Sequence, residues 1–136
     1  VICEYLDSQH KGRKLFPRKG RDRWVALRQQ AMADGLLDAA LLTRYEGALR
    51  PEEKRWSEWS QGQTKKMNGV LDQLEAEVKS LKGKLTIGTV SIVCALGYLD
   101  LRFADMGWRD KRSKLAKWFA QISKLPSIKA TVPPAA

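Results

Sequence analysis

The chain has 136 residues, a length that fits one domain built around a single hydrophobic core. Hydrophobic residues make up 43% and charged residues 29%, which excludes a disordered chain, and no apolar run reaches the ~18 residues that a membrane-spanning helix requires. The net charge of +10 arises mainly from two basic clusters, one early and one late. The first comprises Lys11, Arg13, Lys14, Arg18, Lys19, Arg21, Arg23 and Arg28, and the second Arg109, Lys111, Arg112, Lys114, Lys117, Lys124 and Lys129. Such clusters either attract nucleic acid, anionic membrane or anionic ligands, or form a solvated surface that keeps the protein soluble.

The chain contains few cysteine and histidine residues, the residue types that most often bind metal ions or act as nucleophiles and bases. Cys3 and Cys94 are the only cysteines and lie far apart in apolar helical settings, which excludes a disulfide framework and a structural zinc site. We expect both to be buried free thiols, with a reactive Cys3 as the alternative. His10 is the only histidine, so metal clusters and Ser/His/Asp triads are also excluded.

The first twenty residues are predicted to contain a helix and a linker. Residues 1–10 have apolar side chains at helical spacing but no capping residue in front of them, so we expect the chain to begin inside a helix. Residues 11–20 contain two glycines and a proline, which is typical of a linker. We expect Leu15 and Phe16 to anchor this linker on the rest of the chain.

A long helix is predicted from about residue 22 to residue 49, where Pro51 prevents its continuation. An apolar stripe with the helical period follows Trp24, Leu27, Ala31, Leu42, Tyr45 and Leu49. Residues 31–42 are apolar on almost every face, which is typical of a helix buried in a bundle.

Three further helices follow. Residues 51–83 have one apolar and one charged face, so they are predicted to form a helix on the outside of the bundle. Residues 90–102 are too apolar for a surface and predict a second buried helix, in which Gly97 would allow a close crossing near Gly35. A last helix lies within residues 108–126. Because no strand-like alternation occurs, the predicted fold class is all-α, a bundle of about five helices.

Three acidic residues lie on the helices that we expect to be buried. Asp34 and Asp38 are four residues apart on one side of an apolar helix, where a carboxylate is costly unless it is paired. Each either binds a helix end or an arginine within the fold, or faces a cleft and binds the ammonium group of a ligand. Asp100 is expected to bind a neighbouring backbone or Arg44.

The segment Thr86-Ile87-Gly88-Thr89 precedes the second buried helix. The Thr86 hydroxyl is placed to accept a hydrogen bond from the amide of Thr89 and so to cap the helix. We interpret Thr86 and Thr89 as residues that determine the fold and not as catalytic residues.

In their order along the chain, several segments together resemble the glutathione transferase family. Residues 1–7 are similar to the end of the last helix of its thioredoxin-like domain, and Lys14-Leu15-Phe16-Pro17 is similar to the linker that follows. Asp34-Gly35-Leu36-Leu37-Asp38 resembles the D-G-x-x-D stretch of its fourth helix. Residues 86–102 resemble the capping box and buried sixth helix of bacterial members, with Thr89 where the family usually has Asp.

The resemblance implies a domain organisation and a reaction. Residues 1–10 would end a truncated thioredoxin-like domain, residues 11–20 would form the interdomain linker, and residues 21–136 would form the helical C-terminal domain. The reaction implied is conjugation of the glutathione thiol to an electrophile. Since the thioredoxin-like domain holds glutathione and supplies the thiol-activating residue, no catalytic residue is expected in this chain, and the chain alone is expected to be inactive.

The resemblance also implies site residues and partners. Asp38 matches the carboxylate that reaches across the dimer toward the γ-glutamyl ammonium of glutathione, and Leu41, Arg44 and Tyr45 would border the electrophile pocket. Glutathione would be a co-substrate beside a hydrophobic electrophile, with no cofactor and no metal. We expect a cytoplasmic homodimer without a membrane or nucleic-acid partner. The alternative hypothesis is a non-catalytic scaffold that docks protein or RNA through its basic clusters.

Overall fold

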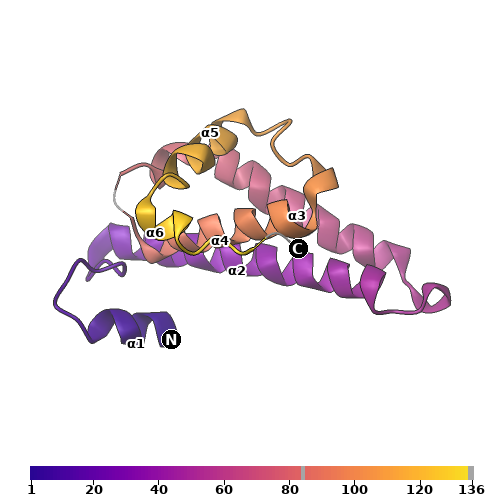
Figure 1. Ribbon diagram of the computed structural model, residues 1–136, viewed down its shortest axis with the longest axis horizontal. Coiled ribbons are helices and arrows are strands. Elements are labelled where there is room, and N and C mark those ends of the chain that lie inside the picture. The colour runs from indigo at the N-terminus through magenta and orange to yellow at the C-terminus, as the bar shows by residue number, and fades with distance from the viewer. Residues whose placement is uncertain (84, 135–136) are drawn as a thin grey trace.

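The computed structural model describes residues 1–83 and 85–134. Within these ranges the chain forms six α-helices, three short 3-10 helices and no strand (Figure 1). The elements are α1 (Ile2–Ser8), α2 (Gly20–Ala48), η1 (Glu52–Lys54), α3 (Ser57–Ala76), η2 (Val78–Leu81), α4 (Ile87–Arg102), η3 (Ala104–Met106), α5 (Ser113–Ile122) and α6 (Pro126–Lys129). The all-α fold class is confirmed. None of the described helices is both long enough and apolar enough to cross a membrane.

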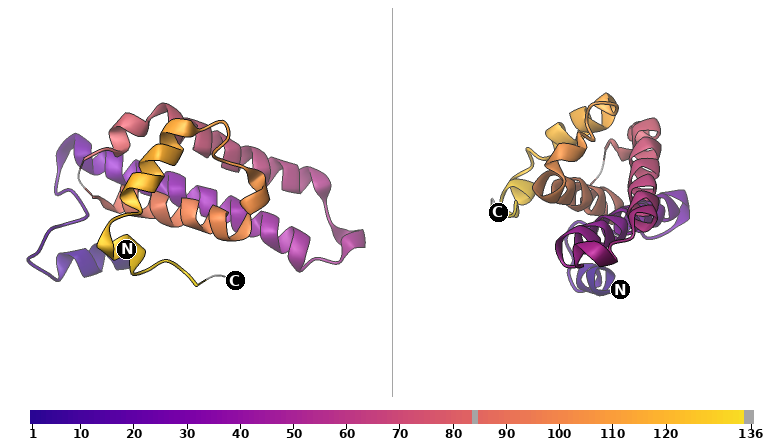
Figure 2. Two further views of the ribbon diagram at one scale, coloured as in Figure 1. Left: turned by 45° about the horizontal axis from the view of Figure 1, so that its top comes forward. Right: turned by 90° about the vertical axis from the view of Figure 1, so that its right-hand side faces the viewer.

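The long helix α2 is the element around which the others are arranged. It packs against both α3 and α4, and α3 runs antiparallel to it as the second arm of a hairpin (Figure 1). Helix α5 contacts α3 and α4 and lies on their side away from α2 (Figure 2). The linker and α1 return beneath the N-terminal end of α2.

The buried face of α2 is built mainly from small residues. Ala33 and Ala40 are fully buried, and Leu36 is the large side chain that they flank. Small side chains on this face let α3 and α4 approach the helix axis closely, because interaxial distance depends on the side chains at the contact.

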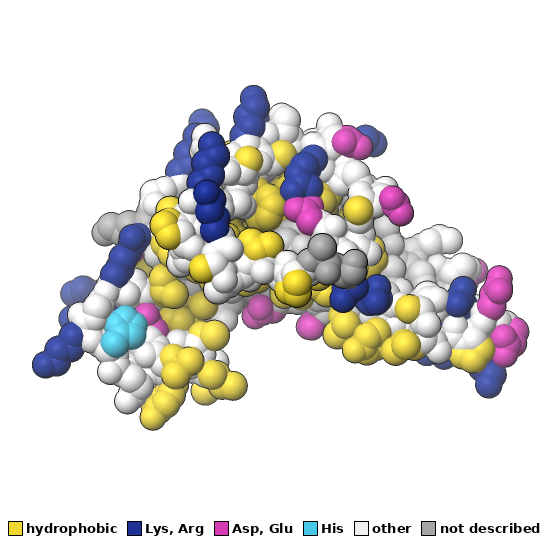
Figure 3. All heavy atoms as spheres, viewed as in Figure 1, with side chains coloured by type: hydrophobic (Ala, Val, Ile, Leu, Met, Phe, Trp, Pro, Cys, Tyr) yellow, Lys and Arg dark blue, Asp and Glu magenta, His cyan; other side chains and the backbone are white. Residues whose placement is uncertain are grey.

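The apolar stripe of α2 lies largely on its surface. Trp24 and Leu49 are each 70% exposed, and Leu42 and Tyr45 are also exposed. The helical period alone does not show which face of α2 is buried, because residues 31–42 are apolar on almost every face. Figure 3 shows hydrophobic side chains along the lower edge of the molecule, over α2, and again over α1.

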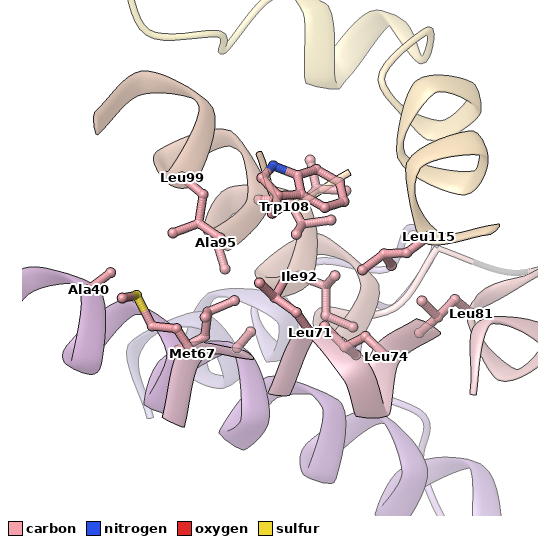
Figure 4. Close-up of a cluster of buried hydrophobic side chains, with 14 of the residues drawn as sticks. Ala40, Met67, Leu71, Leu74, Leu81, Ile92, Ala95, Leu99, Trp108 and Leu115 are labelled. Atoms are coloured by element: carbon pink, nitrogen blue, oxygen red, sulfur yellow. The ribbon is translucent and has the colours of Figure 1, made fainter. Parts of the chain in front are cut away.

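The main core lies between α2, α3, α4 and the segments that follow α4. Met67, Leu71 and Leu74 of α3 converge with Ile92 of α4 and with Leu115, and Figure 4 shows these side chains filling one space. Burying a leucine of this kind stabilises the fold by about 1.5–3 kcal/mol. The second buried helix that we predicted is therefore confirmed as part of the core.

Helices α2 and α4 approach each other closely where α4 begins. A Cβ atom added to Gly88 would lie 2.6 Å from the carbonyl oxygen of Ala26 and 2.6 Å from Cβ of Gln29. A Cβ atom added to Gly97 or Gly35 would have no neighbouring atom within 4 Å. The expected close crossing at Gly97 and Gly35 was wrong, and Gly88 is the glycine that the contact with α2 requires.

The predicted helix over residues 51–83 is divided into three pieces. Residues 52–54 form η1, and Arg55 then adopts an extended backbone with ψ of 137° that ends it before α3 begins at Ser57. At the other end, α3 stops at Ala76 and η2 follows as a tighter turn. The apolar face persists through α3 and η2, so the prediction of one buried face was right although the helix is not continuous.

The segment after α4 is fixed by charged side chains that reach back to α3. Arg112 is buried, and its guanidinium donates to Asp72 Oδ1 at 2.8 Å and to Asn68 Oδ1 at 2.9 Å. The carboxylate of Glu75 accepts a hydrogen bond from the N–H of Leu115 at 2.7 Å. Because Leu115 lies in the first turn of α5, Glu75 satisfies a donor that a helix start leaves free.

Asp100 does not bind Arg44 as we expected. Its Oδ1 accepts from the indole N–H of Trp108 at 2.9 Å, and its Oδ2 accepts from the guanidinium of Arg109 at 2.6 Å. The guanidinium also stacks over the Trp108 ring, 4.3 Å from the ring centroid. The chain turns back after α4 and brings these two partners to Asp100, which sequence spacing does not reveal.

The two cysteines are free and exposed, so the expectation of buried thiols was wrong. Cys94 lies on α4, and Cys3 lies on α1, whose Ile2, Tyr5 and Leu6 are exposed as well.

Candidate functional site

Three of the four residues predicted to contact substrates lie on one face of α2. Asp38, Leu41 and Tyr45 are spaced three and seven residues apart, which places them on neighbouring turns of the same side. All three are exposed, whereas Arg44 lies to the side of this face and is half-buried.

The carboxylates of Asp34 and Asp38 are exposed and form no ion pair with any residue in the described ranges. An ion pair within this part of the chain therefore accounts for neither of them. Asp38 stands in the middle of the exposed apolar stripe of α2, with Leu42 and Tyr45 on the turns that follow.

A groove of about 710 Å³ lies at the tip of the hairpin that α2 and α3 form. Leu42, Tyr45 and Leu49 line it from α2, and Trp56 and Trp59 line it from the start of α3. The two indole rings stack with centroids 6.4 Å apart and planes 21° apart. The groove is mainly apolar, and its volume lies within the roughly 300–1,000 Å³ typical of small-molecule sites.

The structure brings Tyr45 into this groove but not Leu41 or Arg44, which lie outside its lining. Trp56 and Trp59 were not predicted as groove residues, because they belong to the apolar face of the helix predicted over residues 51–83. Their spacing of three residues, directly after a proline turn, is a signal that they share one side of a helix start.

Glu46 also lines the groove, and its contacts hold the two sides of the groove together. Its side chain is buried, Oε1 accepts from the backbone N–H of Trp56 at 2.8 Å, and Oε2 accepts from Arg50 Nε at 2.7 Å. The Trp56 N–H contributes most to holding the pKa of Glu46 below its ordinary value, followed among the favourable contacts by Arg50. The ionised carboxylate thus ties the start of α3 to the end of α2.

A second set of contacts fixes the linker at the opposite end of α2. Asp7 Oδ1 accepts from the N–H of Leu15 at 2.9 Å and Oδ2 accepts from the N–H of Phe16 at 3.3 Å. The Leu15 N–H is the largest cause that keeps the pKa of Asp7 below its ordinary value. Phe16 is buried against Ala26 and Ile87, so the expected anchoring of the linker is confirmed.

The start of α4 has every element of a capping box. The amide of Thr89 donates to Thr86 Oγ1 at 3.3 Å, and the amide of Thr86 donates to Thr89 Oγ1 at 2.9 Å. The Thr89 hydroxyl also donates to the Thr86 carbonyl at 3.0 Å. A threonine thus supplies the reciprocal half of the box that an aspartate usually supplies in the resembled family. The linker adds to the cap, since the carbonyl of Leu15 accepts from the N–H of Ile87 at 2.9 Å.

No group of three or more His, Cys, Asp or Glu side chains that could hold a metal ion occurs among the described residues.

Comparison with known proteins identifies the relatives of this chain. The family model described as "Glutathione S-transferase, C-terminal domain" matches residues 57–121. The curated "Uncharacterized GST-like protein YibF" of Escherichia coli (strain K12) is 31% identical over 139 residues, covering 100% of this chain and 68% of that protein.

Solved structures agree with these matches. A glutathione transferase family member from Pseudomonas fluorescens Pf-5 with bound glutathione is 48% identical with a TM-score of 0.96, covering 98% of this chain and 66% of that one. A structure of a family member from the same strain with bound S-(propanoic acid)-glutathione gives 48% identity and a TM-score of 0.95, with 98% and 69% covered. A glutathione S-transferase from Methylobacillus flagellatus KT with glutathione bound is 30% identical with a TM-score of 0.92, with 98% and 68% covered.

The chain spans about two thirds of the length of these relatives. Within the described residues the matched part contains helices and no strand, and it carries the exposed face of α2 and the capping box of α4 described above. The chain belongs to the glutathione S-transferase family and comprises its C-terminal, all-helical domain.

Proposed function

We propose that this chain is the helical domain of a glutathione transferase, and that it forms the electrophile pocket and the dimer interface of an enzyme that conjugates glutathione to a hydrophobic electrophile. The observation that carries the proposal is the exposed apolar stripe of α2. Large apolar side chains gathered on one helix face mark an interaction or ligand surface more often than a solvated one. The relatives with bound glutathione and S-(propanoic acid)-glutathione support a role toward the same ligand class here.

In this proposal, residues 1–10 end a thioredoxin-like domain, residues 11–20 are the interdomain linker, and residues 21–136 are the helical domain. The contacts of Asp7 with Leu15 and Phe16 support this arrangement, because they join the end of α1 to the linker. The thiol-activating residue would belong to the thioredoxin-like domain. Two free cysteines fit a cytoplasmic protein.

Asp38 is proposed to bind the γ-glutamyl ammonium of a glutathione held by the partner subunit. Its carboxylate is exposed and has no ion-pair partner among the described residues, so it is available to an incoming cation. Leu41, Arg44 and Tyr45 are proposed to border the electrophile, with Tyr45 at the entrance to the tryptophan-lined groove. Glutathione would be a co-substrate, and no cofactor is proposed.

The test is the affinity of the intact protein for glutathione after Asp38→Asn. Losing a hydrogen bond to a charged group costs roughly 1.5–3 kcal/mol, so the dissociation constant should rise about 10- to 100-fold. The melting temperature should not change, since Asp38 is exposed and unpaired in the described chain. Asp34→Asn is the matched control, because Asp34 is an exposed, unpaired carboxylate one turn earlier on α2.

Two results would contradict the proposal. Unchanged glutathione affinity in Asp38→Asn would remove the assigned contact. A lower melting temperature with unchanged affinity would show that Asp38 stabilises the fold and does not bind glutathione.

A further inference from the structure

A second groove, of about 770 Å³, lies where the linker, the start of α2 and the connection from α3 to α4 meet. This second groove is far from the tryptophan-lined groove. Ala26 lines the second groove and Tyr45 lines the tryptophan-lined groove, and these residues are about 28 Å apart along the axis of α2. We call this second groove the linker groove.

Basic side chains surround the linker groove. Arg13 and Arg18 reach it from the linker and Lys82 from the segment before α4, although these segments are far apart in the sequence. All three are exposed, and none forms an ion pair with a carboxylate in the described ranges. Figure 3 shows basic side chains around this end of the molecule, beside His10.

Two further ionisable side chains line the groove. Lys14 lies in the wall, donates to the backbone carbonyls of Asp7 and His10, and interacts with the nearby carboxylate of Asp7. Asp22 is the one acidic residue among the described residues of the lining. Four cations against the carboxylates of Asp22 and Asp7 leave a local excess of positive charge, which favours a ligand carrying more than one negative charge.

The floor of the groove is polar and rigid. Gln29 is 2% exposed, and its amide donates to the hydroxyl of Ser80 at 3.2 Å. The Ser80 hydroxyl in turn donates to the carbonyl of Glu77 at 2.8 Å. Gln29 is also held in place by the close approach of Gly88, so the floor is fixed by the crossing of α2 and α4.

Two long helices begin at the groove. Helix α2 starts at Gly20 without a side-chain cap, so the N–H groups of its first turn have no side-chain acceptor from the capping residue. Helix α4 starts at Ile87 beside the groove residues Thr86 and Thr89. The dipole of α2 therefore adds partial positive charge to that of the arginines and lysines, whereas amides in the first turn of α4 already donate to Thr86 and Leu15.

We propose that the linker groove binds a small molecule that carries phosphate groups. Arg13, Arg18 and Lys82 pair with the phosphate oxygens, and Gln29 and Ser80 form the polar floor beneath the rest of the molecule. A single carboxylate would neutralise only one of these cations, whereas a diphosphate can engage several, and arginine matches phosphate oxygens through paired N–H donors. This site is additional to the proposed conjugation of glutathione.

The experiment is a calorimetric titration of the intact protein with pyrophosphate at low salt. Arg18→Gln and Lys82→Gln should each raise the dissociation constant at least fivefold. Lys117→Gln is the matched control, since Lys117 is an exposed lysine of α5 outside the groove, and it should change the constant less than twofold. Because Arg18 and Lys82 are exposed and form no ion pairs with the residues that the structure describes, melting temperatures should stay the same in all three variants.

Three outcomes would overturn the proposal. The wild-type protein could fail to bind pyrophosphate, or Lys117→Gln could weaken binding as much as the groove variants, which would show non-specific attraction to net charge. Binding of a single-stranded RNA oligomer, lost in Lys82→Gln, without binding of pyrophosphate would instead assign the surface to nucleic acid. Glutathione affinity measured in the same variants separates this site from the proposed transferase function, because it should be unaffected.

Discussion

Replacing Gly88 with alanine would test whether the crossing of α2 and α4 is as close as the structure shows. The added Cβ would lie 2.6 Å from the Ala26 carbonyl oxygen, 2.6 Å from Gln29 Cβ and 2.7 Å from Gln29 Oε1, whereas ordinary van der Waals contact begins at 3.4 Å. One of these three neighbours, the Ala26 carbonyl oxygen, is a backbone atom of α2. Relieving the steric clash therefore requires α4 to shift against α2.

The expected magnitude follows from two opposing terms. Overpacking a core contact costs typically 1–3 kcal/mol, while exchanging glycine for alanine inside a helix contributes up to about 1 kcal/mol of stabilisation. The favourable term is smaller here because Gly88 lies in the first turn of α4. We expect Gly88→Ala to destabilise the protein by about 2 kcal/mol, or roughly 8 °C in melting temperature for a domain of this size.

Gly97→Ala provides a control in the same helix with the opposite sign. A Cβ atom at Gly97 would have no neighbour within 4 Å, so only the higher helix propensity of alanine acts. This substitution should stabilise the protein by about 0.5–1 kcal/mol. Urea unfolding of the two variants beside the wild type measures both effects. If Gly88→Ala proved neutral or stabilising, the close crossing would be refuted.

Two further predictions concern stability. Thr86→Ala should cost about 1 kcal/mol by removing the cap of α4, and Thr86→Ser should recover most of it because the hydroxyl is retained; equal urea midpoints for wild type and Thr86→Ala would exclude the capping role. The depressed pKa of Glu46 means that its stabilisation is complete above its ordinary value of 4.5 and is lost as the pH falls through the lower value of the folded state. Unfolding midpoints between pH 7 and pH 3 should therefore fall less steeply in Glu46→Gln than in the wild type, and identical slopes would show that the carboxylate does not contribute in its ionised form.

The parts of the fold that depend on local patterns could be predicted from the sequence. The spans of α2 and α4 follow from apolar content and from proline, and the capping box of Thr86 and Thr89 joins residues only three apart. The choice of buried face on α2 could not be predicted, because Ala33 and Ala40 carry a weaker hydrophobic signal than Trp24 or Leu49, although the alanines are the residues in the core.

The candidate site was harder to predict than the helices. Tyr45 and Asp38 were placed by resemblance, but the groove beside Tyr45 depends on Trp56, whose position is set by the buried Glu46. The partners of Asp100 likewise depend on how the chain returns after α4. Contacts of this kind join residues that only the tertiary structure brings together.

The two faces of α2 impose different constraints on change in the amino-acid sequence. Enlarging Ala33 or Ala40 would force the neighbouring helices apart, so these positions tolerate few substitutions. Leu42, Tyr45 and Leu49 contribute little to the stability of the chain because they are exposed, and they can be replaced at small cost to folding. The surface that we propose to meet ligands and partners can therefore diversify through mutation while the alanine face keeps the bundle intact.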